Sequence, residues 1–479
     1  MNTRNLTLLT DLYELTMMQG YFETQENETV IFDVFFRNNP NNGGYSIMAG
    51  LDQVINYIKN LNFSYEDVDY LRGLGIFSED FLHYLSGFHF SGDIYAIREG
   101  SVIFPKEPLL KIVAPIMEAQ LVETAILNII NHQCLIATKA SRVVYAAQGD
   151  GIMEFGLRRA QGPDAGLYGA RAAMIGGCVG TSNVLAGQMF DVPVMGTHAH
   201  SWIMSFKDEY TAFKEYARLY PNACTLLVDT YDTLKSGVPN AIRVFTEMRD
   251  AGIHPKSYGI RLDSGDLAYL SKKARKMLDE AGFTDAVIAA SNDLDEFLIN
   301  DLKIQGAKIG SWGVGTNLIT SKDCPSFGGV YKLSAIQNND GEFIPKIKIS
   351  ENVEKITNPG DKTIYRVYDK ETGKIRADLI CFADETWNEE DELLLFDPNA
   401  TWKKTRLPGG SYTMKEILLP IFKHGECIYE SPSVMEIAQF CKEEKETLWD
   451  ETKRLFNPHG VYVDLSRVCM IQKTDCWMT

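Results

Sequence analysis

The sequence has too few basic residues to balance its acidic ones. Among its 479 residues, 47 are Lys or Arg and 64 are Asp or Glu, which gives a formal net charge of −17 at pH 7. Such a surface repels the phosphates of nucleic acids and of anionic membranes. The composition therefore argues against an extended nucleic-acid or membrane interface, but it is compatible with a local cationic pocket for a small anion.

Closely spaced cysteine pairs are also missing. The nine cysteines are an odd number and are scattered along the chain, which is not the pattern of a disulfide-stapled secreted protein. We therefore expect reduced thiols and a cytoplasmic protein. The four C-terminal cysteines, taken with His424 or His459, lack the CxxC spacing of a zinc site, so free thiols are the favoured interpretation there.

Long apolar runs are absent as well. The longest uncharged stretch, residues 172–190, contains four glycines and several polar side chains, which make it too polar for a membrane helix. Asp11 and Glu14 interrupt the apolar residues of the N-terminal segment, so we expect no signal peptide. With 45% apolar and 23% charged residues, the chain should fold into a compact soluble protein of about three domains.

The middle of the chain alternates short apolar runs with segments of helical periodicity. This alternation is typical of βα units and a mostly parallel sheet. Helices are expected at 266–282, where Asp266 can cap the start and Gly282 can end it, and at 238–252. Eight strands, about the number that closes a barrel, are expected at 151–155, 180–184, 193–197, 224–229, 257–262, 286–291, 308–312 and 330–336.

The two ends of the chain differ from this pattern. Residues 1–125 mix a helix near 11–20 with strand-like runs at 30–36, 92–96 and 109–113, and we interpret them as an N-terminal α+β domain. Residues 126–340 would form the (β/α) barrel. Residues 341–479, with strands at 363–368 and 375–382 and a charged helix near 433–456, would form a C-terminal α+β extension.

Polar side chains follow most of the expected barrel strands. Because the carboxyl ends of barrel strands share one mouth, these side chains should converge on a single opening. A single Arg or Asp at such a position is more often a helix cap or a solvated residue, so the set is more informative than any member. The set comprises Phe155, Arg158, Ser182, His198, His200, Asp229, Arg261, Asp263, Asn292, Asp293 and a turn that contains Gly313, Gly315 and Thr316.

Arg261 and Asp263 are the strongest candidates in this set. They are two residues apart on an expected strand, so both can point to one face. Arg261 could hold a pyrophosphate or stack on a ring, and Asp263 could bind a sugar hydroxyl or a magnesium ion. Asp266 is better explained as the cap of the next helix.

His198 and His200 form the closest pair among the eight histidines. No third His or nearby Cys completes a zinc set, so metal binding is the weaker interpretation. A strand-end histidine oriented by Asp229 could instead act as a nucleophile or base. A buried structural role suits His198 better than His200.

The glycine-rich turn at 310–316 could close its backbone N–H groups on a phosphate, although a loop that needs positive φ explains it too. It is not a Walker A loop, and it lacks the third glycine of a dinucleotide fingerprint.

Taken together, these strings resemble the nicotinate phosphoribosyltransferase family over nearly the whole chain. The resemblance rests on TDLYELTM at 10–17, EFGLRRAQGPD at 154–164, TSNVLAG at 181–187, GT and AH at 196–197 and 199–200, RLDSGDL at 261–267 and GVGT at 313–316. It implies a type II phosphoribosyltransferase fold: an irregular (β/α) barrel with an N-terminal α+β domain and a C-terminal extension. It also implies a homodimer with shared active sites, no nucleic-acid partner and no membrane partner.

The resemblance further implies an activity and a role for each candidate. The enzyme would make nicotinate mononucleotide from nicotinate and 5-phosphoribosyl 1-pyrophosphate, with Mg²⁺ as cofactor and ATP as co-substrate, in the first step of NAD biosynthesis from nicotinic acid. ATP would phosphorylate His200 transiently, with Asp229 orienting its ring, and Asp263 would be catalytic and a possible magnesium ligand. Nicotinate would contact Tyr13 of the partner subunit, Phe155, Arg158 and Ser182; the phosphoribosyl donor would contact Arg261, Asp263, Asn292, Asp293, Gly313, Gly315 and Thr316.

Other functions are open on the sequence alone. A nicotinamide or other pyridine phosphoribosyltransferase would differ at the acid pocket, where the nicotinamide enzyme has an aspartate in place of Ser182. A barrel glycoside hydrolase could pair Asp229 with Asp263, but it would leave Arg158, Arg261 and His200 unexplained. A non-catalytic nucleotide sensor would not need the intact set of chemical residues.

Overall fold

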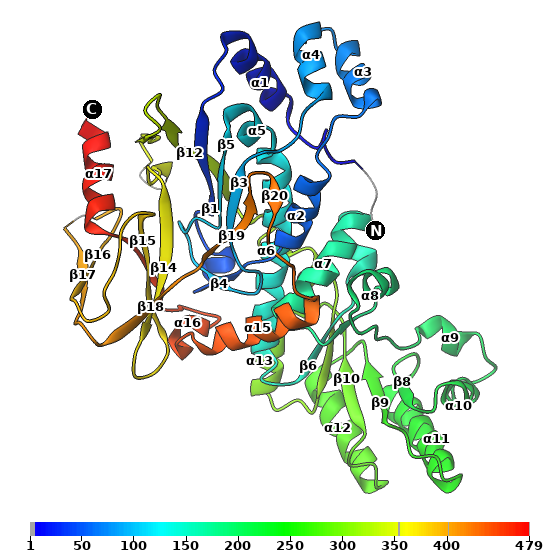
Figure 1. Ribbon diagram of the computed structural model, residues 1–479. Coiled ribbons are helices and arrows are strands. Elements are labelled where there is room, and N and C mark those ends of the chain that lie inside the picture. Colours follow the sequence, from blue (N-terminus) through cyan, green and yellow to red (C-terminus); the bar gives the residue numbers. More distant parts are fainter. Residues whose placement is uncertain (1–4, 353–354, 401, 479) are drawn as a thin grey trace. The chain divides into compact units, whose positions relative to one another are not determined.

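The computed structural model describes residues 5–352, 355–400 and 402–478, with side chains described up to Cys476. The chain divides into two compact units, one made of residues 136–325 and the other of residues 1–135 and 326–479 (Figure 1). The helix α6 (Glu123–Ala146) runs through the boundary between them. Each unit is described on its own below.

A parallel sheet of six strands forms the core of the 136–325 unit. Its strand order is β7-β6-β11-β10-β9-β8, and each neighbouring pair is parallel. The fold class expected from the sequence is confirmed, in the form of an open half-barrel. The strands are β6 (Gly151–Glu154), β7 (Gly180–Thr181), β8 (Ala223–Leu227), β9 (Ser257–Leu262), β10 (Val287–Ala290) and β11 (Ser311–Val314).

Helices alternate with these strands along the chain, and Figure 1 shows α11 and α12 beside β9 and β10. The expected helix at 266–282 is α12, where the Asp266 side chain accepts a hydrogen bond from the N–H of Tyr269 and Gly282 follows with a φ of 85°. The helices of this unit are α7 (Pro163–Gly176), α8 (Val184–Phe190), α9 (His200–Met204), α10 (Glu209–Leu219), α11 (Val238–Asp250), α12 (Leu267–Glu280), α13 (Glu296–Ile304) and α14 (Thr316–Ile319), with short turns η2 (Leu157–Arg159) and η3 (Thr233–Gly237).

Two of the eight expected barrel strands do not join this sheet as strands. The segment 193–197 makes only a single bridge, between Val194 and Thr181. The strand expected at 330–336 exists as β12 (Gly329–Gln337), but it pairs antiparallel with β1 (Thr29–Phe36) in the other unit. The pairing of β12 is fixed by a contact some 300 residues away in sequence, the stacking of Phe32 on Tyr331 at 4.6 Å between ring centroids, which a local pattern does not reveal.

The other unit contains two larger sheets. The first has the order β13-β12-β1-β5-β3-β19-β20, and the second has the order β17-β16-β21-β15-β14-β18. Strands of the first sheet are β3 (Asp93–Ile97), β5 (Leu110–Pro115), β13 (Phe343–Pro345), β19 (Leu418–Lys423) and β20 (Glu426–Cys427). Those of the second are β14 (Lys362–Asp369), β15 (Ile375–Phe382), β16 (Leu393–Phe396), β17 (Lys404–Leu407), β18 (Tyr412–Glu416) and β21 (Tyr462–Leu465); β2 (Ser46–Ile47) pairs with β4 (Val102–Ile103).

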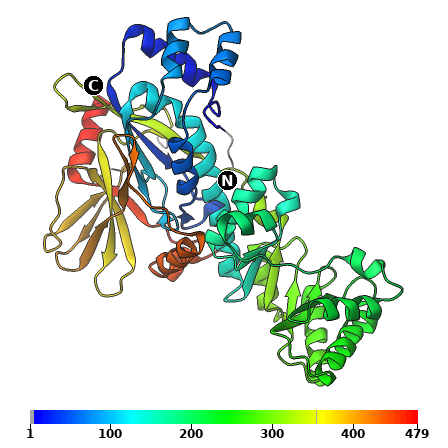
Figure 2. The ribbon, with the colours of Figure 1, turned by 45° about the vertical axis from the view of Figure 1, so that its right-hand side comes forward.

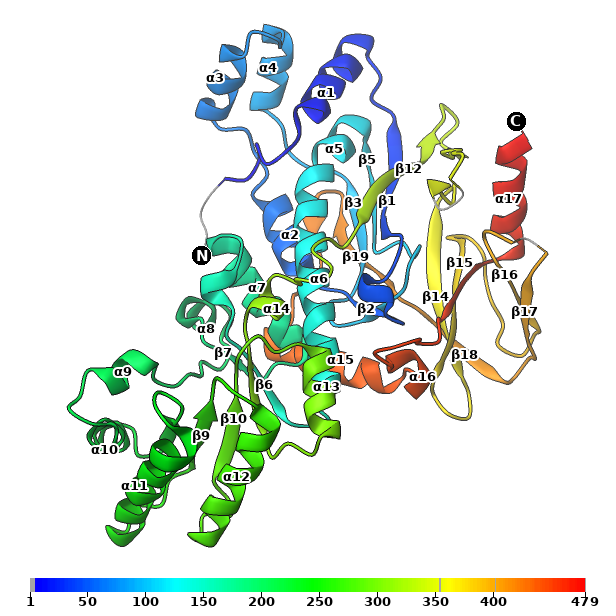
Figure 3. The same cartoon turned by 180° about the vertical axis from the view of Figure 1, so that it is seen from behind.

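Helices complete this second unit. In Figures 2 and 3 the C-terminal helix α17 (Arg467–Met478), in red, lies along the sheet that contains β15 and β16. The charged helix expected at 433–456 is split into α15 (Val434–Glu446) and α16 (Asp450–Lys453). The remaining elements are α1 (Leu12–Thr24), η1 (Pro40–Asn42), α2 (Leu51–Lys59), α3 (Tyr65–Gly73), α4 (Glu79–Ser86) and α5 (Ile116–Leu121).

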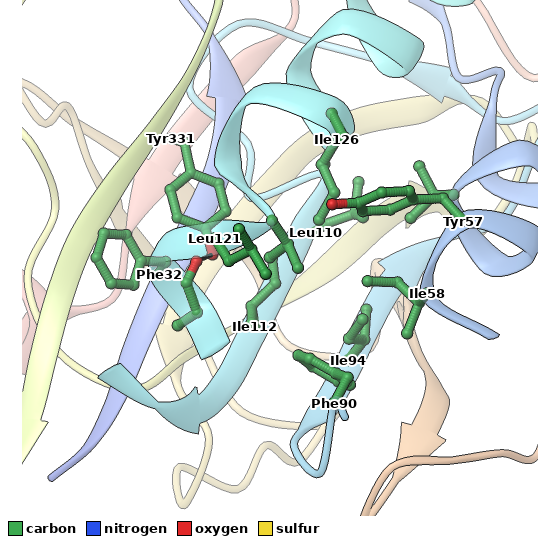
Figure 4. Close-up of a cluster of buried hydrophobic side chains, with 14 of the residues drawn as sticks. Phe32, Tyr57, Ile58, Phe90, Ile94, Leu110, Ile112, Leu121, Ile126 and Tyr331 are labelled. Carbon is green, nitrogen blue, oxygen red and sulfur yellow. Dashed lines mark hydrogen bonds between the residues drawn. The ribbon is translucent and has the colours of Figure 1, made fainter. Parts of the chain in front are cut away.

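The core of this unit is a large apolar cluster between the first sheet and the helices beside it. Figure 4 shows Tyr57 and Ile58 of α2 close to Ile94 and Leu110 of the strands. The hydroxyl of Tyr331 is buried, and it donates a hydrogen bond of 2.5 Å to the carbonyl oxygen of Ala119. The hydroxyl of Tyr331 is therefore satisfied, whereas that of Tyr57, also buried in this cluster, has no hydrogen-bond partner among the described residues.

None of the nine cysteines, all of which lie in described residues, forms a disulfide. Within the described part of the chain, no helix has both the length and the apolar character needed to cross a bilayer.

We predict that Gly259→Ala destabilises the parallel sheet. Gly259 lies in β9 opposite Val287 of β10, and an added Cβ would lie 1.9 Å from the carbonyl oxygen of Val287. Because that oxygen is backbone, the strands must separate, and such overpacking costs about 1–3 kcal/mol. The free energy of unfolding from urea titration measures the loss. Gly310→Ala is the matched control, since a Cβ there meets no atom within 4 Å; equal stability of both variants would contradict the prediction.

Candidate active site

The carboxyl ends of the parallel strands bring several of the expected residues together in the 136–325 unit. Arg261 lies in β9, Asp263 follows it, and Ser291 follows β10. In the sheet register Arg261 pairs with Ala289, so Ser291, two residues further on, has its side chain on the same face. The register therefore explains why these groups meet.

Arg261 is the centre of this cluster. Its guanidinium donates hydrogen bonds to Ser291 Oγ (2.9 Å), Thr197 Oγ1 (2.8 Å) and Asp263 Oδ1 (3.0 Å). The same guanidinium lies 5.9 Å from the centroid of the Phe155 ring. Its position is thus fixed from three segments of the chain, and a fixed cation at a strand end suits an anionic ligand.

Asp263 is held as a carboxylate. Burial alone would raise its pKa, but the hydrogen bond from Ser291 and the charges of Arg261 and His200 outweigh burial, so the pKa of Asp263 lies below its ordinary value. Its second oxygen, Oδ2, lies 3.7 Å from Nε2 of His200. The site therefore keeps a negative charge beside the histidine.

Asp229 contacts the turn that follows β9. Its Oδ2 accepts hydrogen bonds from the backbone N–H of Asp263 and from Ser264 Oγ, both at 2.7 Å. Among the described residues no hydrogen bond or ion pair joins Asp229 to His200, and the bonds of Asp229 fix the turn that presents Asp263. Its other oxygen, Oδ1, is buried and has no hydrogen-bond partner in the described part of the chain.

His200 is the first residue of α9 and is partly exposed. Its Nδ1 lies 3.0 Å from Thr230 Oγ1, and its Nε2 faces Asp263. A ring held through Nδ1–H by the threonine would leave the Nε2 lone pair available to a ligand.

His198, two residues earlier, is buried. Its Nε2 accepts a hydrogen bond from the N–H of Leu227 at 3.3 Å, and its ring packs edge-on against Tyr216 at 4.6 Å. Burial is the main cause that lowers the pKa of His198 to about 4. The sequence-based assignment of a structural role to His198 is confirmed by this burial.

Phe155 and Gly313 form a second part of the site. Phe155 follows β6, and its ring is half-buried. A Cβ on Gly313 would lie 2.6 Å from the ring, so this glycine makes room for the aromatic side chain. Gly315 and Thr316 follow at the start of α14, where a Cβ on Gly315 would face the Phe155 carbonyl oxygen at 3.3 Å.

Ser182 and Arg158 follow neighbouring strands of the sheet, Ser182 after β7 and Arg158 after β6. The N–H of Ser182 donates to the carbonyl oxygen of Glu154 at 3.0 Å, which places Ser182 beside β6. Arg158 lies in the turn η2, is exposed, and has no hydrogen bond or ion pair with any described residue. An exposed arginine without a protein partner can receive an anionic ligand.

Asn292 and Asp293 form a strained turn after β10. Both are non-glycine residues with left-handed backbones, with φ of 99° and 40°. Nδ2 of Asn317 donates to the carbonyl oxygens of Asp293 (2.8 Å) and Leu294 (3.1 Å) and so holds the turn. Strain maintained by neighbouring contacts is frequent at functional sites.

Tyr13 is the one expected residue that belongs to the other unit. It lies on α1 and is 47% exposed.

Comparisons with known proteins match these features over the whole chain. Models of the nicotinate phosphoribosyltransferase N-terminal domain, family and C-terminal domain match residues 8–131, 151–372 and 361–472. Nicotinate phosphoribosyltransferase of Bacillus subtilis is 47% identical over 474 residues, which covers 99% of this chain and 94% of the relative. This chain belongs to the nicotinate phosphoribosyltransferase family.

More distant members of the family also match over nearly the whole chain. The human nicotinate phosphoribosyltransferase sequence is 31% identical and covers 96% of this chain and 94% of its own. A crystal structure of the human nicotinic acid phosphoribosyltransferase superposes with a TM-score of 0.85, covering 97% of this chain and 99% of that one. The half-barrel with its N- and C-terminal parts is therefore the fold of this family.

Several supporting residues of this nicotinate phosphoribosyltransferase site were not singled out from the sequence. Thr197 and Ser291 hold Arg261, Thr230 holds His200, and Asn317 holds the 292–293 turn. Glu154 is fully buried, and its carboxylate accepts hydrogen bonds from Thr181 Oγ1 (2.6 Å) and the Gly156 N–H; burial raises its pKa. Of these residues, only Ser291 could have been predicted from the sequence, because the register of adjacent parallel strands places it beside Arg261.

We predict that His198 makes the protein acid-sensitive. The pKa of His198 is about 4 in the folded protein against 6.5 as its ordinary value, so unfolding takes up a proton. Stability is unaffected above pH 6.5 and falls as the pH drops toward 4, by roughly 2–3 kcal/mol at pH 4.5. Urea titrations at pH 7.5 and 4.5 should show a smaller pH difference for His198→Gln than for the wild type.

His254→Gln, which removes an exposed histidine, is the control and should keep the wild-type pH difference. An NMR titration in which the His198 ring protonates near pH 6.5 would contradict the prediction.

Proposed function

We propose that this protein synthesises nicotinate mononucleotide and pyrophosphate from nicotinate and 5-phosphoribosyl 1-pyrophosphate, in an ATP-dependent reaction that begins NAD biosynthesis from nicotinic acid. The observation that carries the proposal is the Arg261–Asp263–His200 arrangement at the strand ends. Its relatives, named nicotinate phosphoribosyltransferases, extend over the full chain. We further propose that it acts in the cytoplasm as a homodimer with shared active sites.

In this proposal, nicotinate stacks on Phe155, with Tyr13 supplied by a second copy of the chain. Its carboxylate pairs with Arg158, which is exposed and has no ion pair among the described residues. Ser182 carries no charge, so it does not repel the acid. The pocket would therefore favour nicotinate over the neutral amide.

The phosphoribosyl donor would bind across the strand ends. Arg261 retains guanidinium N–H groups that its three hydrogen bonds leave unused, and these can donate to the pyrophosphate. Asp263, Asn292 and Asp293 would bind the ribose region, and the turn at 313–316 would bind the 5′-phosphate. Gly313 would thus serve the phosphate-binding turn, and it also makes room for the ring of Phe155.

The chemistry needs positioning and electrostatic stabilisation. The ring nitrogen of nicotinate attacks C1 of the ribose, the C1–O bond breaks, and the electron pair leaves with pyrophosphate. Positive charge grows on the sugar, where Asp263 can stabilise it, and negative charge grows on the leaving group, where Arg261 can. Because both groups are fixed before the substrates bind, little reorganisation is needed during the reaction.

The residues also fit a magnesium ion. Asp229 Oδ1 is buried without a hydrogen bond, and Oδ2 of the neighbouring Asp263 accepts no hydrogen bond from described residues other than its contact with His200. One or two carboxylates with substrate phosphates are the usual magnesium environment. When bound, magnesium would neutralise charge on the pyrophosphate.

ATP would act through His200. With Thr230 accepting from Nδ1–H, Nε2 can attack the γ-phosphorus; the N–P bond forms, the bridging P–O bond breaks, and ADP leaves. Asp263 lies 3.7 Å from Nε2, so phosphorylation of His200 places two negative groups together. That repulsion would couple the state of His200 to the residue that binds the donor.

The test is turnover of the purified full-length protein. With nicotinate, 5-phosphoribosyl 1-pyrophosphate and Mg²⁺-ATP, we expect nicotinate mononucleotide, pyrophosphate, ADP and phosphate. In His200→Ala, ATP-dependent stimulation and ADP release should fall on the order of 100-fold or more, while ATP-independent turnover remains. Product formation and ADP release are followed by chromatography.

Absence of any mononucleotide in the wild type would overturn the assignment. Unchanged ADP release in His200→Ala would contradict only the phosphohistidine part of the proposal. Lys207→Ala, which changes an exposed residue after α9, is the control and should keep wild-type turnover.

A second prediction concerns the acid pocket. Ser182→Asp would place a carboxylate near that of nicotinate, at a cost on the order of 2 kcal/mol, or about 30-fold in kcat/KM. Ser182→Ala is the matched control and should change kcat/KM for nicotinate only a few-fold. Steady-state kinetics with nicotinate and nicotinamide distinguish the two variants. Equal kcat/KM for nicotinate in Ser182→Asp and the wild type would place Ser182 outside the pocket.

A further inference from the structure

A hollow lies in the unit made of residues 1–135 and 326–479, whereas the Arg261 cluster belongs to the other unit. It is a cleft of about 300 Å³. Its walls come from residues 104–106, from the turn at 397–399 that follows β16, and from the segment 460–464 that contains β21. This volume matches the lower end of ordinary small-molecule pockets.

Asp464 is the most unusual residue of this cleft. It lies in β21, is only 5% exposed, and lines the cleft. Its carboxylate makes no hydrogen bond and no ion pair with any residue that the structure describes. A carboxylate that is largely shielded from solvent, lines a cleft and has no protein partner can pair with a cation that enters the cleft.

The charges around Asp464 do not supply that group. Burial, and then the negative charge of Asp397, raise the pKa of Asp464 to about 6, and the charge of Lys403 only partly opposes them. Asp397 accepts the N–H groups of Asn399 (2.8 Å) and Ala400 (3.1 Å), and its other oxygen lies 3.9 Å from Lys403 Nζ. Lys106 lines the cleft but has interactions of its own. Two carboxylates thus face the cleft, one of them without a partner.

The rest of the wall combines apolar side chains with polar ones, since the amides of Asn39 and Asn399 also line it. Phe104, Pro105, Val461 and Val463 line the cleft, and Tyr462 adds an aromatic ring. A divalent cation would find only two carboxylates there, and that of Asp397 already accepts the N–H groups of Asn399 and Ala400. An anion would be repelled by Asp397 and Asp464. The remaining ligand class is an organic cation with an apolar body.

We propose that this cleft binds a small organic molecule that carries a primary ammonium group, with the ammonium paired to Asp464 and the apolar body against Phe104 and Val463. Such a ligand is opposite in charge to nicotinate and to phosphoribosyl pyrophosphate, so the cleft is not a second site for the proposed substrates. The inference stands on Asp464 and its surroundings and does not depend on the proposed activity.

Benzylamine is a suitable probe, and benzyl alcohol and benzoate are its neutral and anionic counterparts. Isothermal titration calorimetry with the full-length protein at pH 7.5 should show binding of benzylamine at least tenfold tighter than that of benzyl alcohol, and no binding of benzoate. Asp464→Asn should weaken benzylamine at least tenfold. Asp340→Asn, which removes an exposed carboxylate from a distant turn of the sequence, should leave the affinity unchanged.

Two further measurements keep the test decisive. Asn399→Trp adds bulk at an exposed position of the cleft wall and should abolish benzylamine binding even if Asp464→Asn fails to fold. Lowering the pH from 7.5 to 5 should weaken wild-type binding, because Asp464 becomes protonated. Equal affinity for the three probes, unchanged affinity in Asn399→Trp, or displacement of benzylamine by excess Mg²⁺ would overturn the proposal.

Discussion

The arrangement of the candidate active site depends on the hydrogen bonds of a single guanidinium. Arg261 lies in a strand that is paired on both sides, so its backbone cannot move without breaking the sheet. Its side chain then donates hydrogen bonds to Thr197, Asp263 and Ser291. Asp263 follows β9, Ser291 follows β10, and Thr197 precedes α9. A half-buried cation has to find partners for its desolvated N–H groups. Satisfying Arg261 therefore brings these segments to one place, and it also fixes Asp263 beside His200.

The acidic net charge of the chain is compatible with a cationic site. A chain with a charge of −17 repels free anions at long range. Over a few ångströms, however, the fixed guanidinium of Arg261 and the exposed Arg158 determine the potential, because salt screens distant surface charges more than close ones. The excess of carboxylates thus opposes nonspecific anion binding over the surface, while the strand ends retain the positive groups that an anionic substrate needs.

The features that could be predicted from the sequence are those that depend on nearby residues. The strand at 257–262, the Asp266 cap and the burial of His198 depend on neighbours within a few residues or on one apolar pattern, and they agree with the structure. The errors have long-range causes. The strand expected in the barrel at 330–336 pairs with β1, which lies about 300 residues earlier in the sequence. The partner in such a long-range pairing cannot be inferred from the residues next to the strand. Supporting residues such as Thr230 and Asn317 were missed for the same reason.

The two histidines of the 198–200 segment show how the fold divides similar side chains between structure and chemistry. His198 lies against Tyr216 and accepts the Leu227 N–H, so burial lowers its pKa and keeps it neutral. A neutral ring that accepts a backbone hydrogen bond can tie the segment to β8 without adding charge beside Arg261. His200, at the start of α9, is left with one nitrogen toward Thr230 and the other toward Asp263. The hydrogen bond from Leu227 to His198 lies only two residues from His200, so it restricts the backbone from which the His200 side chain extends.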